Sequence, residues 1–428
     1  MRIEITRVID VPDELVGVNA LEAVVREEGF ALMRELFGTL WQRFQALHWH
    51  CPKCGSREVE GAGEKTFDLL TAFGKVNLPR QRLACQQCGT IAKPLDDWLR
   101  ALGEHRATWF VQELTCLAGA SWPFAAAETI VERVLLGPIS HEQVRQVSTA
   151  EGERVATQLA KEAQAVLEAP VMDKGEEDPQ GINVVVDGDW VRSRDNPEGM
   201  EGKVGVVYTG VAKVGKHRRK LVNRRYAVTF NGSDLLGKLV YAEASKLGVE
   251  QAQRLRLLGD GAAWEETIQA EHFHRAKRVL DLWHLERRIS RALQSVFASQ
   301  PDELTLHREQ LRCWIRQGKA EETLAELRGF AERYREVPKE LAKTIGYVER
   351  HRSAIINYEA DLATGEHVGS GAVEKAGDLV INRRFKGRRG MRWWRKNADA
   401  LASLRVLYLN GDWDQHWLQR RSRPPEAA

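Results

Sequence analysis

The sequence predicts an α/β protein of several domains, in which a sheet carries the functional residues. Two observations predict the core. Three strand-like segments follow one another, INVVVDGDWVRSR, KVGVVYTGVAKV and RRKLVNRRYAVTF, and helical and strand-like segments then alternate. This order of elements is typical of an α/β core. A third observation, two CxxCG motifs upstream, predicts a separate metal-binding domain. At 428 residues the chain exceeds a single core, so we expect two to four domains.

The composition is that of a folded protein and identifies no partner by itself. Hydrophobic residues make up 43% and charged residues 29%, and the net charge is only +3. The distribution of charge is more informative, because basic residues cluster at 216–225 and 383–396. No stretch approaches about 20 uncharged apolar residues, and the amino terminus lacks the apolar core of a signal peptide, so we expect no membrane span.

Residues 1–50 form an N-terminal helical segment. Apolar residues at helical spacing between 17 and 48 predict one or two amphipathic helices, with Gly29 and Gly38 as weak points. The pattern assigns this segment no role beyond oligomer contacts.

Residues 51–100 predict a zinc ribbon. The two CxxCG motifs flank a hairpin-like segment with a turn at Phe73-Gly74, and the glycine that ends each motif permits a tight turn. Four thiolates close a tetrahedral site and leave no position for water, so we expect structural rather than catalytic Zn²⁺. A structural role alone and a role in DNA contact both stay open for the ribbon. The predicted ligands are Cys51, Cys54, Cys85 and Cys88.

The other two cysteines, Cys116 and Cys313, are isolated in the sequence. Two close pairs and two single residues are a metal-binding pattern of a reducing compartment rather than a disulfide framework. We therefore expect a cytoplasmic protein.

Residues 101–170 predict a helical domain of three short helices with a break at Gly137-Pro138. Ser140 with Gln143 three residues later predicts a capping box at the start of the last helix. The three helices are compatible with a helix-turn-helix that inserts its third helix into a major groove. A plain helical bundle is the alternative, and the third helix is not strongly basic.

The α/β core is expected at 181–285 and 364–410, after an acidic linker at 171–180. Helices are predicted at about 234–248 and from Ala262, with a strand RLRLLGDG between them. Three strands followed by alternating helix and strand give the order of an RNase H-like core. The charged helical residues 286–363 are expected to be an insertion, and 411–428 a C-terminal tail.

Acidic residues follow two predicted strands of this core. Asp187 and Asp189 lie in or just past the first strand, and Asp260 ends the strand before Gly261. Glu374 lies on a predicted helix after a GSG turn. Taken singly, such residues are helix caps or turn formers more often than catalytic groups. Together, three carboxylates at one sheet edge can hold two divalent cations about 4 Å apart, and oxygen ligands favour Mg²⁺ or Mn²⁺.

The residues also resemble a known group of proteins. DGDWV, LLGDGAAW, RVLDLWHLERRI and VGSGAVE, with NRRFKGRRGMRWW after it, are similar to bacterial insertion-sequence transposases that have an RNase H-like DDE core. Within these, the chain resembles the group in which a cysteine-knuckle domain precedes the core. The resemblance covers the chain from Cys51 to about Trp417 and implies Asp187, Asp260 and Glu374 as the catalytic carboxylates.

The resemblance implies further groups beside the catalytic residues. Asp281 and His284 match a DxxH element near the site. The alternative interpretation of His284 is a helix-start residue with a local hydrogen bond. Asp189 competes with Asp187 for the role of first ligand, because residues two apart on a strand share a face. Asp378, one helical turn after Glu374, is expected to face outward.

The basic segment is expected to bind the phosphates that flank the reacting one. The predicted DNA contacts are Arg383, Arg384, Lys386, Arg388, Arg389, Arg392 and Trp393. Trp393 and Trp394 are predicted either to stack on unpaired bases or to belong to the core.

The implied activity is that of a DNA transposase. It would hydrolyse the phosphodiester at the ends of an insertion sequence and join the 3′-hydroxyl to target DNA, with two divalent ions in the site. Its partners would be double-stranded DNA and further copies of the chain, in the nucleoid. A metal-dependent nuclease or resolvase on the same fold, and a zinc-ribbon repressor without catalysis, are the alternatives.

Overall fold

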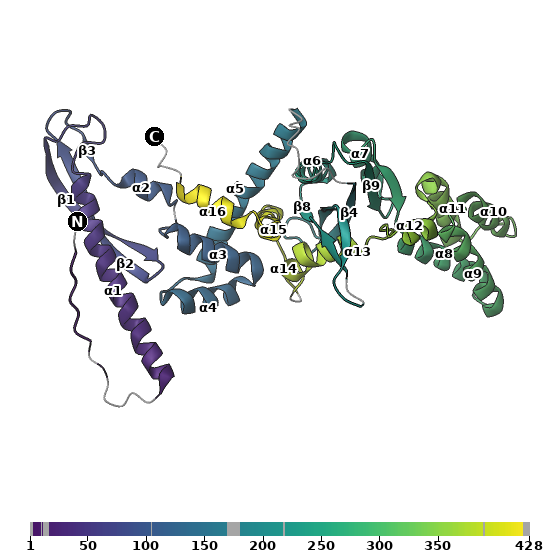
Figure 1. Cartoon of the computed structure of the whole chain (residues 1–428), viewed down its shortest axis with the longest axis horizontal. Coiled ribbons are helices and arrows are strands. Elements are labelled where there is room, and N and C mark those ends of the chain that lie inside the picture. Colours follow the sequence, from purple (N-terminus) through teal and green to yellow (C-terminus); the bar gives the residue numbers. More distant parts are fainter. Residues whose placement is uncertain are drawn as a thin grey trace. The chain divides into compact units, whose positions relative to one another are not determined.

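The computed structural model describes residues 3–9, 11, 17–103, 105–168, 180–216, 219–387 and 390–422. They form a mixed α/β structure, as predicted, whose elements are labelled in Figure 1. The chain divides into two compact units, one of Met1–Glu151 with Asp412–Ala428, and one of Gly152–Gly411. In the described part, no helix combines the length and apolarity needed to span a bilayer.

The first unit begins with one long helix rather than two. Helix α1 (Val18–Leu47) continues through Gly29 and Gly38. It packs on the antiparallel pair β1 (Val59–Thr71) and β2 (Gly74–Cys85), which β3 (Ile91–Ala92) extends. Phe37 and Trp41 of the helix cover the buried residues of this sheet, because one face of the helix is apolar. The hairpin turns at residues 72–73, one residue earlier than predicted.

The helical part of the first unit follows a short helix α2 (Asp96–Ala101). It contains α3 (Trp109–Ser121), α4 (Phe124–Leu135) and the start of α5 (His141–Glu168). The predicted capping box is confirmed: the Gln143 amide donates to Ser140 Oγ at 3.2 Å, and the Ser140 amide donates to Gln143 Oε1 at 2.9 Å. Part of the predicted tail forms α16 (Trp413–Ser422), which packs in this unit against α3.

The second unit is built on a five-stranded sheet in the order β10-β9-β4-β5-β8. Its strands are β4 (Gly181–Val191), β5 (Met200–Tyr208), β8 (Arg225–Thr229), β9 (Arg254–Gly259) and β10 (Lys277–Leu280). Strands β4, β5 and β8 pair antiparallel, whereas β9 and β10 add in parallel on the other side of β4. Strands β6 (Gly210–Lys213) and β7 (Arg219–Val222) form a separate hairpin, and β7 contains Arg219 and Lys220 of the basic cluster at 216–225.

The two faces of the sheet are covered by different helices. Val184 and Val186 of β4 pack in one apolar cluster with residues of α6 (Ser233–Ser245) and α7 (Ala263–His272). Side chains alternate along a strand, so Asp187 and Asp189 belong to the opposite face. Helix α13 (Gly371–Gly377) packs on β4 and β5.

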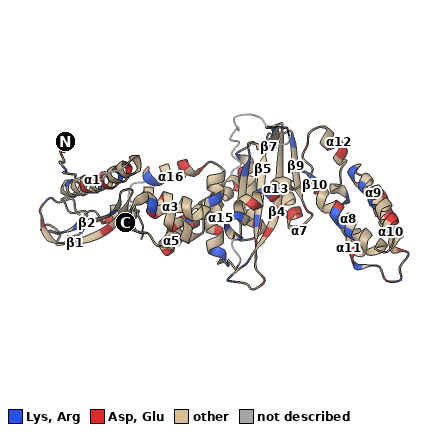
Figure 2. Ribbon diagram, turned by 90° about the horizontal axis from the view of Figure 1, so that it is seen from below, with Lys and Arg blue, Asp and Glu red and all other residues tan. Residues whose placement is uncertain are grey.

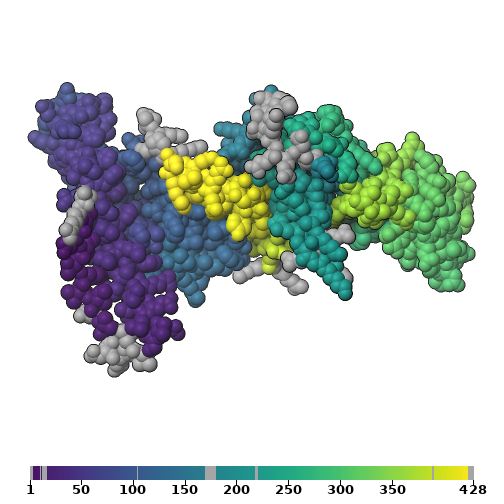
Figure 3. Space-filling model, viewed as in Figure 1, coloured from purple at the N-terminus to yellow at the C-terminus, as the bar shows by residue number. Residues whose placement is uncertain are grey.

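The helical insertion begins slightly earlier than predicted, with α8 (Leu282–Phe297). It continues through α9 (Pro301–Arg316), α10 (Ala320–Ala331), α11 (Lys339–His351), a 3-10 turn (Arg352–Ala354) and α12 (Tyr358–Ala363). Its residues are green in Figure 3. Basic and acidic residues alternate along these helices (Figure 2), and ion pairs such as Arg316–Glu286 at 2.7 Å join them.

The last part of the second unit returns to the sheet. Helix α13 runs into a π-helical turn (Asp378–Asn382) and α14 (Arg383–Phe385), and α15 (Arg395–Leu409) follows. Arg405 of α15 donates to the carbonyl oxygens of Val380, at 2.9 Å, and Leu379. A π turn leaves carbonyls without their usual partners, so this guanidinium stabilises the irregular turn.

Candidate active site and metal centre

Asp187 and Asp260 lie side by side at one edge of the sheet. Strands β4 and β9 pair in parallel as far as Val185 and Leu258. Two residues further along this register, Asp187 comes beside Asp260, which follows β9 directly. Neighbouring strands lie about 4.8 Å apart. The sheet therefore brings together two of the three predicted catalytic carboxylates.

Electrostatic interaction between these groups agrees with that register. Burial raises the pKa of Asp187 to about 6, while the Gly188 amide, which donates to Asp187 Oδ1 at 2.7 Å, opposes the shift. The negative charges of Asp260 and Asp189 also raise the pKa of Asp187, and His284 lowers it. Like charges raise a carboxyl pKa only when they lie close together.

Asp281 ends the next parallel strand at the same edge. Leu280 of β10 pairs with Gly259, and the Asp281 amide donates to the Gly259 carbonyl at 2.8 Å. The side chain of Asp281 is buried and caps α8, accepting from the amide of His284 at 2.6 Å and from its Nδ1 at 2.9 Å. It also accepts from the Ser370 amide. Asp281 therefore holds the GSG turn and His284 in place.

His284 forms a local hydrogen bond at the start of α8, and it also lies near Asp187 and Asp260. The hydrogen bond to Asp281 raises the pKa of His284, and the charges of Asp260 and Asp187 act in the same direction. The local hydrogen bond expected for a histidine at the start of a helix is thus present. The imidazole also lies near enough to the two strand-end aspartates to sense their charge.

Asp189 is neutralised by residues of the basic segment. Its Oδ1 lies 2.7 Å from Lys386 Nζ, and the Asn382 side-chain amide donates to Oδ2 at 3.2 Å. A carboxylate already paired with an ammonium group attracts a metal ion less strongly. Of the two aspartates of β4, the geometry therefore favours Asp187 as a metal ligand.

Glu374 is exposed and lies beside the buried face of α13, which is formed by Ala372, Val373, Ala376 and Gly377. At one end of that face, the Ser370 amide binds Asp281, and Ser370 Oγ lies 3.2 Å from Glu374 Oε1. At the other end, a Cβ on Gly377 would lie 2.5 Å from Asp189 Oδ2, so only glycine permits this approach. Residues four and three apart share a helix face. Two neighbours of Glu374, Ser370 and Gly377, thus lie against Asp281 and Asp189.

Asp187, Asp260 and Glu374 have one property in common. In the described ranges, none of them forms an ion pair with a lysine or arginine; their carboxylates contact the Gly188 amide, the Ala262 amide and Ser370 Oγ. By contrast, Asp378 pairs with Lys375 at 2.9 Å and with Arg383, and it faces outward as predicted. Among Asp187, Asp189, Asp260, Glu374 and Asp378, the three predicted catalytic acids are therefore the ones without a lysine or arginine partner.

The three carboxylates do not form a closed site for a single ion. Among the described residues, the one group of three or more possible ligands whose donor atoms all lie within 4.8 Å of one another is the cysteine quartet. Carboxylates that share two cations about 4 Å apart can be separated more widely than that.

Glu265 is a residue of this region that the sequence interpretation missed. Its side chain is 1% exposed, and its two oxygens accept from the amides of Asp260 and Gly261, each at 3.0 Å. Burial raises the pKa of Glu265 to about 8, and the charge of Asp260 acts in the same direction. Tyr347, from α11 of the insertion, donates to the Asp260 carbonyl. The Asp260 loop is therefore held from two sides. A glutamate in the first turn of the next helix was the available signal.

The basic segment differs from its prediction at two positions. Arg384 is 2% exposed and its guanidinium lies 4.7 Å from the Trp393 ring, which is 7% exposed. Both side chains are buried in the interior. The prediction that Arg384 and Trp393 contact DNA is therefore wrong. Arg383 and Lys386 are partly exposed and paired with Asp378 and Asp189, and Arg392 is exposed. Arg388 and Arg389 lie outside the described residues.

The four predicted zinc ligands come together in the first unit. Cys51 Sγ lies 3.7 Å from Cys88 Sγ, and Cys54 Sγ lies 3.6 Å from Cys85 Sγ. A tetrahedron with metal–sulfur distances of about 2.3 Å has sulfurs about 3.8 Å apart, so these thiols fit a Cys₄ metal site.

The two cysteine knuckles repeat one local geometry. In each, the glycine amide donates to the carbonyl of the first cysteine, at 2.8 Å for Gly55 and 3.0 Å for Gly89. Both glycines have positive φ, of 75° and 68°, which other residues rarely adopt. Hydrogen bonds from the Thr90 side chain and amide lower the pKa of the Cys88 thiol to about 6, which favours the thiolate that binds metal.

Comparison with known proteins gives one family and no characterised relative. The profile of a family described as "Uncharacterised protein family (UPF0236)" matches residues 57–421, which include the three sheets of the described residues and all the carboxylates above. A search of the curated proteins found no match.

Proposed function

The chain belongs to Uncharacterised protein family (UPF0236), and from the site geometry we propose that it is a DNA transposase of the DDE type. It binds the ends of an insertion sequence, hydrolyses a phosphodiester there and joins the released 3′-hydroxyl to target DNA. One observation carries the proposal: the register of β4 and β9 brings Asp187 beside Asp260, and helix α13, which bears Glu374, packs on β4 and β5. No lysine or arginine of the described residues pairs with these three acids.

The sheet order supports an RNase H-like core for this enzyme. Three antiparallel strands lie on one side, and β9 and β10 continue in parallel from the first of them. In sheets of this kind, ligands bind outside the carboxyl ends of the parallel strands. Asp187, Asp260 and Asp281 all lie there.

Two divalent cations, Mg²⁺ or Mn²⁺, fit the carboxylate oxygens of Asp187, Asp260 and Glu374, and when bound they would neutralise charge on the attacking and leaving oxygens. Asp281 keeps the GSG turn of Glu374 beside the strand ends through the Ser370 amide. Glu265 fixes the backbone of Asp260. These residues orient the acidic groups before DNA arrives.

DNA phosphates are bound by exposed cations near the carboxylates. Arg383 and Arg392 are exposed, and Lys386 exchanges Asp189 for a phosphate when DNA binds. Arg405 supports the backbone of this segment through the carbonyls of Val380 and Leu379, and buried Arg384 packs on the Trp393 ring. The ribbon, with Zn²⁺ on its four cysteines, and the helices α3 to α5 contribute to binding of the DNA ends. Two copies of the chain hold two ends together.

The proposal is tested with DNA that carries the inverted repeats flanking the gene, a target plasmid and Mg²⁺. The wild type should cleave the end and join pre-cut ends to the plasmid. Glu374→Gln should lower cleavage by at least about 100-fold, because the carboxylate contribution to charge neutralisation is lost. End binding, measured by gel shift, should stay within about twofold.

Asp378→Asn is the matched control, because Asp378 lies one turn further along and is already ion-paired. It should cleave at close to the wild-type rate. Wild-type cleavage by Glu374→Gln would exclude Glu374 as a ligand. Cleavage without joining of pre-cut ends would indicate a metal-dependent nuclease instead.

A further inference from the structure

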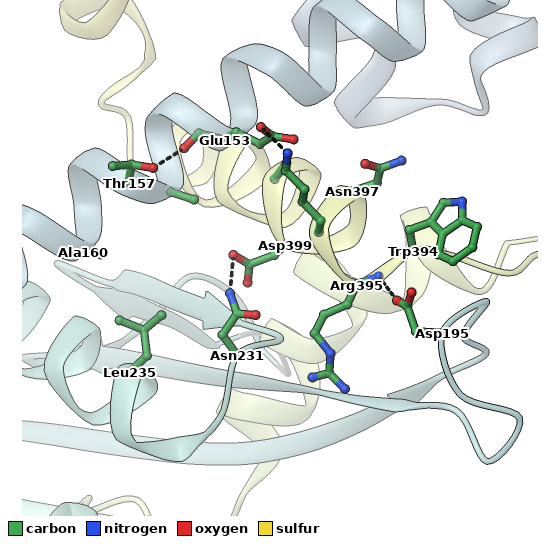
Figure 4. A pocket seen from close by; sticks show the side chains of 13 residues that line it. Glu153, Thr157, Ala160, Asp195, Asn231, Leu235, Trp394, Arg395, Asn397 and Asp399 are labelled. Atoms are coloured by element: carbon green, nitrogen blue, oxygen red, sulfur yellow. Dashed lines mark hydrogen bonds and ion pairs between the residues drawn. The ribbon is translucent and has the colours of Figure 1, made fainter.

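A pocket of about 810 Å³ in the second unit has no role in the proposed reaction (Figure 4). Its wall comes from the later part of α5, from the segment after β8 and from the start of α15. The lining includes Ala156, Ala160, Leu235, Trp394, Asn397 and Asp399. Small apolar side chains thus cover one side of the pocket, and an indole and polar groups lie opposite.

Most polar groups of the lining are occupied by one another. Asp399 accepts from Thr229 Oγ1, from the Phe230 amide and from Asn231 Nδ2, at 2.7–2.9 Å. The amide of Arg395 donates to Asp195 at 2.6 Å. Lys396 Nζ lies 3.0 Å from Glu153 Oε2. Lys396 is thus paired with an acid, and the charged side chains of the lining, Glu153, Asp195, Asp399, Arg395 and Lys396, offer a phosphate no net positive charge.

Two side chains of the lining have no hydrogen-bond or ion-pair partner in the described part of the chain. They are the indole of Trp394, which is 49% exposed, and the half-buried carboxamide of Asn397. Figure 4 shows both at the same side of the pocket. An aromatic plane with an amide beside it suits a flat, neutral ligand with a donor and an acceptor on its edge. A nucleobase has both features.

The backbone fixes which of the two tryptophans faces this pocket. The Trp393 amide donates to the Arg192 carbonyl at 3.1 Å, and its carbonyl accepts from the Arg194 amide at 2.8 Å. The Trp393 ring is buried, and neighbouring residues of an extended chain point to opposite sides. Burial of Trp393 therefore turns Trp394 outward.

The same contact links the pocket to the strand that bears Asp187. Ser193, which bridges to Trp393, lies six residues after Asp187 along extended chain. That separation is roughly 20 Å. Along one strand of duplex DNA, this distance spans about six nucleotides.

We propose that this pocket binds one unpaired base of the DNA, adenine in preference to others, by stacking on Trp394 and hydrogen bonding to Asn397. The inference rests on the proposed function, because it names the part of the DNA that is held beside the carboxylates. Asparagine can donate and accept at once to the N6/N7 edge of adenine, which gives the preference.

The test measures binding by the full-length protein, without magnesium, so that no cleavage is required. The probes are single-stranded oligodeoxyadenylate, oligodeoxycytidylate and a blunt duplex of equal length, each with a fluorescent label. Trp394→Ala should weaken binding of oligodeoxyadenylate by about 10- to 100-fold, from the stacking contribution of one base. Binding of the blunt duplex should change by less than about twofold.

Further variants separate stacking from a general loss of structure. Trp394→Phe should recover most of the affinity, and Asn397→Ala should abolish the preference for adenylate over cytidylate. Tyr334→Ala is the control, since Tyr334 is 37% exposed and lies in the helical insertion, to which no DNA contact is assigned. An oligodeoxyadenylate probe with 2-aminopurine should be quenched by the wild type and not by Trp394→Ala.

Equal binding of oligodeoxyadenylate by wild type and Trp394→Ala overturns the inference, as does a wild type that shows no quenching. Either result leaves cleavage and joining at the carboxylates untouched. Conversely, a protein that binds the unpaired base in this way but never cleaves DNA would retain this pocket and lose the proposed transposase activity.

Discussion

Asp187 and Asp189 lie two residues apart on the same strand, but their partners differ. Asp189 is bound by Lys386 and Asn382, whereas Asp187 contacts the Gly188 amide and faces Asp260. Trp393 and Trp394 differ in the same way, with one ring buried and the next exposed. At this scale, function is decided by which group each side chain meets, and neighbours in sequence can have unrelated roles.

Glu265 gives the prediction at the scale of a residue. Above pH 8, where Glu265 is ionised, Glu265→Gln leaves one acceptor oxygen where the carboxylate has two, so one of the amides of Asp260 and Gly261 loses its partner. We expect the free energy of unfolding to fall by about 1–3 kcal/mol. Urea unfolding measures this change, and cleavage should slow as well because Asp260 is less well positioned.

The neighbouring Glu266→Gln is its control. Glu266 is partly exposed and pairs with Arg278 at 2.7 Å, so its loss should cost no more than about 1 kcal/mol. If both variants unfolded at the same urea concentration as the wild type, the amides of the Asp260 loop would not depend on Glu265.

The elements differ in how far they depend on the rest of the chain. Each cysteine knuckle closes on its own hydrogen bonds, and the two meet at the end of the β1–β2 hairpin. The π turn of Asp378–Asn382, by contrast, depends on Arg405 of another helix. Local elements of the first kind follow from short motifs, whereas elements of the second kind need a tertiary partner.

Cys51→Ser tests the proposed metal site of the four cysteines. A hard hydroxyl replaces a thiolate ligand, so we expect bound zinc to fall from about one ion per chain to nearly none. Metal analysis of the purified protein measures this. Amide exchange should also become faster in β1 and β2, because a structural zinc contributes to folding.

Cys313→Ser, at an exposed cysteine of α9, should keep its zinc. Full zinc content in Cys51→Ser would show that the four thiols do not form the site. Amide exchange in β9 should be the same in both variants, since that strand lies in the second unit.

The whole molecule consists of two units, and the first is assembled from both ends of the chain. Trp417 of α16 is 1% exposed, and His416 Nε2 lies 2.9 Å from Glu151 Oε1, a pair separated by 265 residues. Trp413 Nε1 donates to Glu113 of α3 at 3.3 Å. The second unit is a continuous segment inserted between these parts.

Truncation after Gly411 tests this arrangement. Loss of α16 uncovers the apolar surface that Trp417 buries, so α3 and the first half of α5 should exchange their amide protons faster. Trp417→Ala should act in the same direction and destabilise the first unit by about 3–5 kcal/mol. Strand β9 should keep its protection in both proteins. Unchanged exchange in α3 after truncation would contradict the assignment of α16 to the first unit.

Short-range patterns in the sequence determined much of this protein. The cysteine spacing predicted the four thiols that lie together, Ser140 and Gln143 predicted the capping box, and the strand order predicted that Asp187 and Asp260 are neighbours. These features depend on residues within a few positions of each other, or on strand order. Only the tertiary structure decided that Lys386 pairs with Asp189, 197 residues away, and that Arg384 is buried. Ion pairing and burial depend on which distant segments pack together, and residue spacing along the chain does not contain that information.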